Sequence, residues 1–383
     1  MDRVKIGLVG SGFAAALHME AYKQVYGIEP WVAAVASPSE RAGDFAREYG
    51  IPSVYRCMEE MIRKERPDVV DICSPPSLHA PMIGSAMGAG CHVICEKPLT
   101  GWFGDSAEPF MAKKVMEQLE QLRRVVERSG RKFFYAENFI YAPAVQKSAS
   151  LIRAAGEHIL FMRGEESHSG SHAGHAALWS MNGGGSLIRQ GCHPLSALLY
   201  LKQLENGKGA KAVGVMADMG YIVPTLNEEE RKNIQARPKD VEDLANVILT
   251  FEDGTKALIT AGDMILGGVR NEIQVYTTGG VYQCRIAPSD QMTTYHVDDE
   301  KLSGQYFTEK VETKKGWQSI FMCEDMARGY VGELRDFLLC AAGRKGEPES
   351  GFSLAYDTVR IIYGAYCSAR EGRRIEFSDT LWA

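Results

Sequence analysis

The stretch KIGLVGSGFAAALHMEAY, residues 5–22, constrains the fold more than any other part of the chain. It consists of an apolar strand pattern, the pattern Gly10-x-Gly12-x-x-Ala15, and a helix pattern. Gly10 allows a tight turn, Gly12 lets backbone amides approach a pyrophosphate, and Ala15 permits close packing of helix on strand. The N-terminus of a helix, here near Phe13, favours negative charge. Because a strand precedes the pattern and a helix follows it, we predict a Rossmann-type dinucleotide site.

Residues 1–138 alternate apolar strand-like runs with amphipathic helical stretches. The expected strands are 5–10, 31–36, 68–73, 92–96 and 132–137, and helical stretches include 40–50, 78–90 and 111–130. This alternation is typical of βαβ units and a parallel sheet. It predicts a dinucleotide-binding Rossmann domain over residues 1–138.

The pattern changes from about residue 157 to longer strands with period-two alternation. Residues 240–263 predict a hairpin that turns at Asp253-Gly254, and residues 271–286 predict a second one that turns at Gly279-Gly280. Helices are expected at about 325–342 and 354–371. We therefore predict an α/β Rossmann domain plus an α+β domain, 139–383, with a large, mostly antiparallel open-faced sheet.

Charge, hydropathy and cysteine content exclude several classes of protein. The net charge of −6 and the absence of a lysine or arginine run argue against nucleic-acid binding. No stretch approaches the roughly 20 apolar residues of a membrane span. The nine cysteines include no second pair that would complete a zinc site with Cys91 and Cys95. We interpret all nine as reduced core residues of a cytoplasmic protein.

Two later strands end in polar motifs, DVVDICSPPSLH (68–79) and HVICEKP (92–98). In an open parallel sheet, ligands bind beyond the carboxyl ends of the strands. Lys97 would therefore be delivered to the nicotinamide end of the cofactor, with Pro98 fixing the backbone behind it and a cis bond possible there. The expected cofactor contacts from these motifs are Ser74, Pro75, His79, Glu96 and Lys97.

The residue at the end of the second strand normally grips the adenosine ribose of NAD through a carboxylate. Here that position is Ser37, which neither bonds both hydroxyls strongly nor repels a 2′-phosphate. Arg41 could pair with such a phosphate or could be a solvated helix residue. NAD is favoured as cofactor, and NADP is not excluded.

Together these motifs resemble the Gfo/Idh/MocA oxidoreductases, the family of glucose–fructose oxidoreductase and inositol dehydrogenase. The resemblance rests on Gly10-x-Gly12, Pro-Pro-x-x-His (75–79), Glu96-Lys97-Pro98 and GGGSLIRQGCHPL (183–195). It covers nearly the whole chain and implies oxidation or reduction of a sugar or cyclitol with NAD(P). It further implies catalytic roles for Lys97 and His193, and it places Asn138 and Tyr141 near the nicotinamide.

The sequence departs from the family at one catalytic position. An aspartate usually lies four residues before the histidine, where this chain has Arg189. If Arg189 points into the site, its charge would lower the pKa of Lys97, so that Lys97 or His193 could be the neutral base. Alternatively, Arg189 binds a carboxylate or phosphate on the substrate. A third interpretation is a surface ion pair.

Two segments could shape the substrate site. ESHSGSHAGHAALW (166–179) contains three histidines, for which we expect hydrogen bonds to sugar hydroxyls rather than metal binding. The expected substrate contacts are Lys97, Tyr141, His168, His172, Trp179, Arg189 and His193. Trp179 could stack on a sugar or lie in the core. The insertion 101–110 is either a loop over the site or a surface loop with a hydrophobic anchor.

The leading hypothesis is a cytoplasmic NAD(P)-dependent dehydrogenase that acts on a sugar, glycoside or cyclitol hydroxyl. His193 or Lys97 would take the hydroxyl proton, and the two loops would favour glycosides. One alternative is a hydrolase or lyase that oxidises a glycoside only transiently, and another is a dinucleotide-binding sensor. The family resemblance also implies a small-molecule carbohydrate substrate, and a homodimer or homotetramer formed through the second, substrate-binding domain. The charge and hydropathy described above predict no nucleic-acid or membrane partner.

Overall fold

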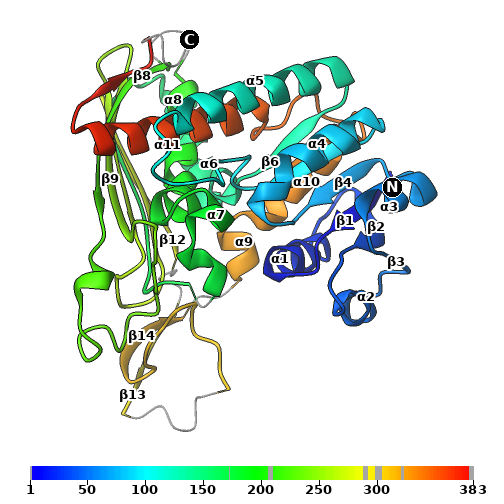
Figure 1. Cartoon of the computed structure of the whole chain (residues 1–383), viewed down its shortest axis with the longest axis horizontal. Helices are drawn as coiled ribbons and strands as arrows, with labels where there is room; N and C mark the ends of the chain where they lie inside the picture. The colour runs from blue at the N-terminus through cyan, green and yellow to red at the C-terminus, as the bar shows by residue number, and fades with distance from the viewer. Residues whose placement is uncertain are drawn as a thin grey trace.

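The computed structural model describes residues 2–171, 173–205, 210–287, 292–297, 304–320 and 323–378. They form two large sheets with helices between and around them (Figure 1). This architecture confirms the predicted combination of a Rossmann sheet with an α+β unit. The domain boundary at residue 138 stays a prediction.

The first sheet is parallel throughout, with the strand order β3-β2-β1-β4-β5-β6. Its strands are β1 (Arg3–Val9), β2 (Glu29–Ala36), β3 (Ser53–Tyr55), β4 (Val69–Ile72), β5 (His92–Glu96) and β6 (Phe133–Ala136). Five of the six were predicted. The exception, β3, has only three residues and carries no readable alternation. The carboxyl ends of β1, β4 and β5 meet at one edge, where the polar motifs lie.

Helices cover both faces of this sheet. They are α1 (Phe13–Tyr22), α2 (Ala42–Tyr49), α3 (Met58–Glu65), α4 (His79–Gly88) and α5 (Met111–Ser129), joined by α10 (Tyr330–Ala341) and α11 (Phe352–Glu371) from the end of the chain. α1 packs on α10, whereas α3, α4, α5 and α11 contact one another in that order. The last helices of the chain therefore belong to the packing of the first sheet (Figure 1).

Edge strand β6 is held between those two late helices. Phe134 stacks on Phe337 of α10 with ring centroids 5.1 Å apart, and Phe133 packs edge-on against Phe352 of α11 at 5.6 Å. Successive strand residues point to opposite faces, so each phenylalanine faces a different helix. Ser350 adds a hydrogen bond from its Oγ to Tyr135 O, 2.7 Å away.

The second sheet has the order β12-β11-β7-β10-β9-β8-β15. Its strands are β7 (Ile159–Ser167), β8 (Ala212–Gly220), β9 (Leu244–Phe251), β10 (Lys256–Gly262), β11 (Arg270–Thr277), β12 (Val281–Ala287) and β15 (Ile375–Glu376). Only β7 and β10 pair in parallel, and the β9–β10 and β11–β12 hairpins confirm both predicted turns. The helices α6 (Pro143–Ala155) and α8 (Cys192–Gln203) pack on its inner face. In Figure 1 no helix covers the opposite face in the described part of the chain.

Short elements complete the description. They are α7 (Trp179–Asn182), α9 (Glu324–Ala327), the hairpin β13 (Met292–His296) and β14 (Gly316–Ile320), the 3₁₀ turns Pro76–Leu78, Asn138–Tyr141, Gly174–Ala177 and Val223–Thr225, and a π-helical turn, Leu187–Gly191. All nine cysteines are free thiols, as predicted. Cys57 and Cys323 are exposed, so their assignment to the core was wrong. Among the described residues, none of the helices is both long and apolar enough to cross a bilayer.

Candidate active site

The turn between β1 and α1 fits a dinucleotide pyrophosphate. Gly10 has φ +106°, and a Cβ there would lie 2.5 Å from the carbonyl oxygen of Cys73. A Cβ on Gly12 would meet nothing within 4 Å, so its backbone faces open space. No side chain caps the N-terminus of α1 at Phe13, which leaves backbone N–H groups available for an anion. Ala15 is fully buried and lets the helix lie close to the sheet.

The adenosine end contains the two polar residues that were predicted there. Ser37 is buried, and its Oγ lies 3.0 Å from Ser11 Oγ. Arg41 is exposed at the start of α2. Neither observation distinguishes a free ribose hydroxyl from a phosphorylated one, so the choice between NAD and NADP stays a prediction.

His79 joins the two loops that follow β4 and β5. Its Nδ1 lies 2.7 Å from Pro98 O and its Nε2 lies 2.9 Å from Ser74 O. The side chain is fully buried and joins the two loops, and its direct contact with the cofactor stays a prediction. Pro75 caps the 3₁₀ turn between them.

Lys97 lies beside the π-helical turn. Its Nζ donates a hydrogen bond to the backbone oxygen of Arg189, 2.7 Å away, and the Lys97–Pro98 bond is cis as suggested. Burial by itself lowers the pKa of Lys97, but Cys192 and Glu96 raise it, and the net shift is upward. A lowered pKa was expected only if Arg189 pointed into the site, and that condition is not met, because its guanidinium binds Asp263.

His193 is the second central residue of the site. Its Nδ1 lies 2.6 Å from Glu137 Oε1, and its ring stacks on Phe139 with centroids 4.8 Å apart. Glu137 is fully buried at the end of β6 and His193 lies in the first turn of α8. The orienting carboxylate that position 189 lacks is thus supplied by another element.

Glu166 adds a third carboxyl group. It lies on the inner face of β7, where the neighbouring inner-face residue Gly164 packs against Pro194 of α8. Burial raises the pKa of Glu166, although the charges of His193 and Lys97 partly oppose the shift. Its buried Oε2 has no hydrogen-bond partner in the described part of the chain.

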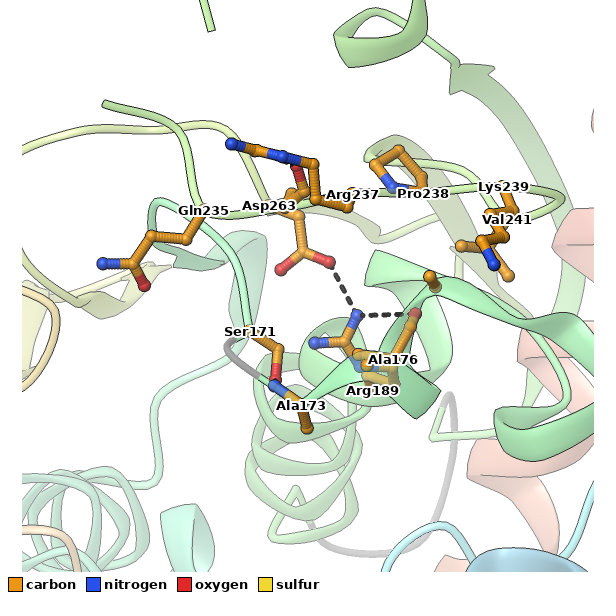
Figure 2. A pocket seen from close by; sticks show the side chains of 13 residues that line it. Ser171, Ala173, Ala176, Arg189, Gln235, Arg237, Pro238, Lys239, Val241 and Asp263 are labelled. Carbon is orange, nitrogen blue, oxygen red and sulfur yellow. Dashed lines mark hydrogen bonds and ion pairs between the residues drawn. The ribbon is translucent and has the colours of Figure 1, made fainter. Parts of the chain in front are cut away.

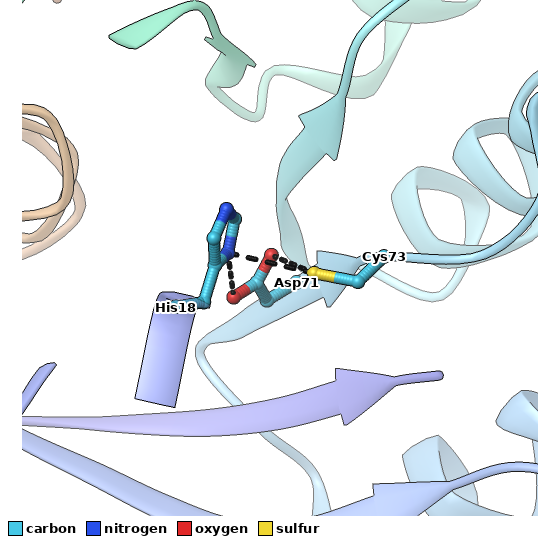
Figure 3. A group of neighbouring side chains, drawn as sticks. All are labelled: His18, Asp71 and Cys73. Carbon is cyan, nitrogen blue, oxygen red and sulfur yellow. Dashed lines mark hydrogen bonds and ion pairs between the residues drawn. The ribbon is translucent and has the colours of Figure 1, made fainter. Parts of the chain in front are cut away.

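A buried chain of polar groups leads from β4 to Glu96. His18 Nδ1 lies 2.8 Å from Asp71 Oδ2, and its Nε2 lies 3.2 Å from Glu96 Oε1. Tyr22 donates a hydrogen bond to the same Asp71 oxygen, while Cys73 lies on the other side of the carboxylate (Figure 3). Burial opposes the charge of His18, but Asp71 prevails and raises its pKa well above the usual value.

The glycine-rich loop 183–187 is fixed by one buried acid. Glu242 accepts hydrogen bonds from the backbone N–H groups of Gly185 and Leu187, each at 2.9 Å, and from Tyr366 Oη at 2.9 Å. A Cβ on Gly185 would lie 2.0 Å from the carbonyl oxygen of Glu242, so only glycine permits this approach. The loop leads directly into the π-helical turn.

Arg189 points away from Lys97. Its Nη1 donates to Asp263 Oδ2 at 2.7 Å, and the pair lines a cavity of about 430 Å³ (Figure 2). The side chain of Arg189 is 16% exposed and that of Asp263 6%, so the suggested surface ion pair is instead a largely buried one.

Family models match both halves of the chain. Residues 4–128 match the model described as "Oxidoreductase family, NAD-binding Rossmann fold", and residues 158–283 match the GFO/IDH/MocA C-terminal domain. The chain belongs to the GFO/IDH/MocA oxidoreductase family. It is accordingly an NAD-binding oxidoreductase that acts on CH–OH groups.

Several named proteins are similar to this chain at modest sequence identity. D-apiose dehydrogenase of Paraburkholderia graminis is 23% identical over 99% of this chain and 91% of its own length. D-glucoside 3-dehydrogenase of Escherichia coli is 31% identical over 32% of this chain and 33% of its own length. Among solved structures, GenD2 from gentamicin A biosynthesis, in complex with NAD, has a TM-score of 0.80 at 22% identity over 99% of this chain and 97% of its own. That likeness concerns the fold.

Three side chains that were expected to contact the cofactor or the substrate form hydrogen bonds with other groups of the protein. Asn138 Nδ2 donates to Arg328 O at 2.9 Å, and Tyr141 Oη donates to Asp336 Oδ2 at 2.8 Å. Trp179 is 4% exposed and donates from Nε1 to Trp102 O at 2.9 Å. These side chains join segments of the fold, and Trp179 lies in the core, the second of its two interpretations. The ligand contacts expected of Asn138 and Tyr141 stay predictions.

The insertion 101–110 is anchored rather than free. Trp102 N donates to Tyr363 Oη at 2.6 Å, and a Cβ on Gly183 would lie 3.4 Å from the ring of Phe103. Of the two interpretations, the structure favours a surface loop with a hydrophobic anchor. The anchor contacts the glycine-rich loop.

The histidine-rich segment contributes one buried ring. His168 Nδ1 accepts a hydrogen bond from Gly170 N at 3.0 Å, and burial lowers the pKa of His168 to about 4. His175 is exposed, and His172 lies outside the described residues. Side chains close enough to hold a metal ion are found elsewhere in the described ranges: His18, Asp71 and Cys73; Glu137, Cys192 and His193; His158, Glu205 and Asp253. That this protein uses no metal stays a prediction.

Proposed function

We propose that this protein is an NAD-dependent dehydrogenase that oxidises a secondary hydroxyl of a sugar, a glycoside or a cyclitol. The observation that carries the proposal is the 2.6 Å contact between His193 Nδ1 and Glu137 Oε1. A histidine oriented by a carboxylate, with a lysine ammonium beside it, is suited to removing a hydroxyl proton. The names of the relatives, a D-apiose dehydrogenase and a D-glucoside 3-dehydrogenase, support this class of substrate.

His193 is the proposed general base. With Nδ1–H donated to Glu137, the lone pair of the neutral imidazole lies on Nε2. That atom would receive the hydroxyl proton, and the carboxylate of Glu137 would stabilise the imidazolium that forms.

Lys97 is the proposed electrostatic partner. Its raised pKa keeps the ammonium protonated at neutral pH, so Lys97 is not the base. One of its three N–H groups binds Arg189 O, which leaves the others to hold the reacting oxygen. A cation there stabilises the developing alkoxide.

Gly10, Gly12 and the N-terminus of α1 would hold the pyrophosphate. The bound nicotinamide would accept the hydride of the carbinol carbon. The buried chain from Asp71 through His18 to Glu96 supports the backbone of Lys97, because Glu96 Oε2 accepts a hydrogen bond from Lys97 N at 3.0 Å.

The test is a turnover assay of purified protein with NAD or NADP and a panel of sugars, cyclitols and aryl glycosides. Nicotinamide absorbance and released aglycone are followed in the same reactions, with Lys97→Met and His193→Asn as comparison variants. We expect cofactor reduction with an intact glycosidic bond and its loss in both variants. Aglycone release without net reduction would replace the dehydrogenase by a redox-assisted hydrolase, and full activity of Lys97→Met would refute the site.

A further inference from the structure

The cavity of about 430 Å³ described above lies outside the reaction centre. Its walls are formed by Ser171 and residues 173–177 on one side and by residues 235–241 on the other, and Arg189 and Asp263 lie between them (Figure 2). The volume is sufficient for a substituent or a second ring of a sugar substrate.

One residue, Arg189, contacts both the candidate reaction centre and the cavity. The backbone oxygen of Arg189 holds Lys97 Nζ, whereas the guanidinium of the same residue lines the cavity. Arg189 therefore links the candidate reaction centre to the cavity, through its backbone on one side and its side chain on the other.

The wall that faces Arg189 is built by hydrogen bonds. Gln235 N and Ala236 N both donate to Ser169 O, at 2.6 and 3.1 Å. A Cβ on Gly170 would lie 2.1 Å from Ala236 N, so the two segments are in direct contact. Lys239 N donates to Ala177 O at 3.0 Å and fixes the other end. The cavity is thus pre-formed.

Its charges are predominantly positive. Three basic residues, Arg189, Arg237 and Lys239, line the cavity with one acid, Asp263. Asp263 is occupied, because its two oxygens bind Arg189 Nη1 and Gln190 Nε2. In the described part of the chain, neither Arg237 nor Lys239 forms an ion pair, and the hydrogen bonds of Arg189 use only Nη1.

The neighbouring groups do not cancel this charge. His168 Nδ1 lies 3.6 Å from Asp263 Oδ1, but the low pKa of His168 keeps the ring neutral. Glu309 is paired with Arg328 at 3.0 Å. Arg237 Nη1 donates to Ala236 O at 2.7 Å, which holds the guanidinium at the cavity wall without neutralising it.

We propose that this cavity is a subsite for an anionic substituent of the substrate, a carboxylate or a phosphate, held by Arg189, Arg237 and Lys239. Guanidinium groups bind such oxygens through charge-assisted, paired hydrogen bonds. The proposal rests on the proposed function, since it assumes that the reacting ring lies at Lys97 and His193. It accounts for an arginine at position 189, where the guanidinium is held by Asp263 and presents its remaining N–H groups to the ligand.

The test measures binding without turnover. Methyl β-D-glucuronide, methyl β-D-glucoside and glucose 6-phosphate are titrated calorimetrically into protein, with and without NADH, so that no hydroxyl can be oxidised. The first two probes differ only in the substituent on C5, which is a carboxylate in the glucuronide and a hydroxymethyl group in the glucoside. The variant R237Q/K239Q removes two charges from the cavity wall, and R124Q/K147Q removes two exposed charges elsewhere as a matched control.

We expect at least one anionic probe to bind tenfold or more tightly than the glucoside. R237Q/K239Q should abolish this difference and R124Q/K147Q should keep it. Preference for the glucuronide or the phosphate would identify which anion the site takes. Equal binding of all three probes, or a preference that survives R237Q/K239Q, would overturn the subsite. Preferential binding together with no cofactor reduction in the turnover assay would instead refute the dehydrogenase and leave the subsite standing.

Discussion

At the scale of single residues, we propose that Glu137 orients His193 in place of an acid at position 189. It reaches His193 from the end of β6, and the two side chains are 56 positions apart in sequence. Because Glu137 is fully buried, its carboxylate has no competing solvent contact and binds the imidazole directly.

Replacing Glu137 by glutamine should lower kcat. The amide cannot stabilise the imidazolium and allows the wrong tautomer of His193, so we expect a loss of roughly 100-fold or more. Steady-state kinetics over a range of pH measures the effect, and the NAD dissociation constant should stay near that of the wild type. Glu137→Asp, which keeps the charge, should recover part of the activity. Equal kcat in wild type and Glu137→Gln would exclude this role.

His168 should make the stability of the protein depend on acid. Its folded pKa of about 4 lies below the usual 6.5, so only the unfolded chain binds a proton between these values. The stabilisation is fully present above pH 6.5 and is lost as the pH falls towards 4, by up to about 3 kcal/mol. Denaturant unfolding of wild type and His168→Gln from pH 7 to 4 should show a shallower decline in the variant. Parallel curves would contradict the assignment.

The sequence suggests a role for a residue that belongs to a motif. It does not suggest one where the role depends on a partner far away in the sequence. Lys97 and His193 were proposed as catalytic residues because they belong to motifs, and their roles stay predictions. The orientation of Arg189, and with it the direction of the pKa shift of Lys97, was left open because its partner Asp263 is 74 positions away and belongs to no motif. Glu137 directly follows strand β6, and Glu96 is the last residue of strand β5. A carboxylate at the end of a strand was the one signal in the sequence that pointed to Glu137.

At the scale of elements, substitutions at two glycines of the turn between β1 and α1 should affect folding and cofactor binding separately. Gly10→Ala would place a methyl group 2.5 Å from Cys73 O at a positive φ, so we expect a clearly lower melting temperature. Gly12→Ala has open space and φ −97°, so its melting temperature should stay close to wild type. It should still weaken NAD binding by roughly tenfold or more, because the methyl group intrudes on the phosphates. Thermal melts and NAD titration test both, and normal NAD affinity in Gly12→Ala would contradict the proposed cradle.

Elements with a local period were predicted well, and loops were not. The β9–β10 hairpin follows from alternation and its Asp253-Gly254 turn. The loop 183–187 takes its shape from Glu242, a residue 57 positions from Gly185, and no local pattern reveals that bond. For the same reason Trp179 could be read as a ligand contact, whereas its neighbour across the fold, Tyr366, places it in the core.

At the scale of the whole molecule, the open face of the second sheet should join two copies of the chain. Met216 and Ile248 are direct cross-strand neighbours on this face, and they are 51% and 46% exposed. Ile248 is also opposite Leu258, so three apolar side chains form one row. Such a row on a wide sheet favours burial against another protein surface.

Ile248→Asp should therefore shift the protein towards monomer, as measured by light scattering across a dilution series. Val54→Asp, an exposed position on β3 of the first sheet, is the matched control and should leave the assembly unchanged. A monomeric wild type, or an assembly that tolerates Ile248→Asp, would contradict this arrangement.

The position of α10 and α11 bears on how the protein is made. During translation, residues 2–136 emerge from the ribosome long before Phe337 and Phe352 are synthesised. These two phenylalanines cover the two sides of β6. Until then the edge strand of the nascent Rossmann sheet exposes apolar side chains, and such surfaces aggregate or recruit chaperones. Completion of the cofactor-binding half therefore waits for the last part of translation, so truncated chains should be cleared rather than accumulate as NAD-binding fragments.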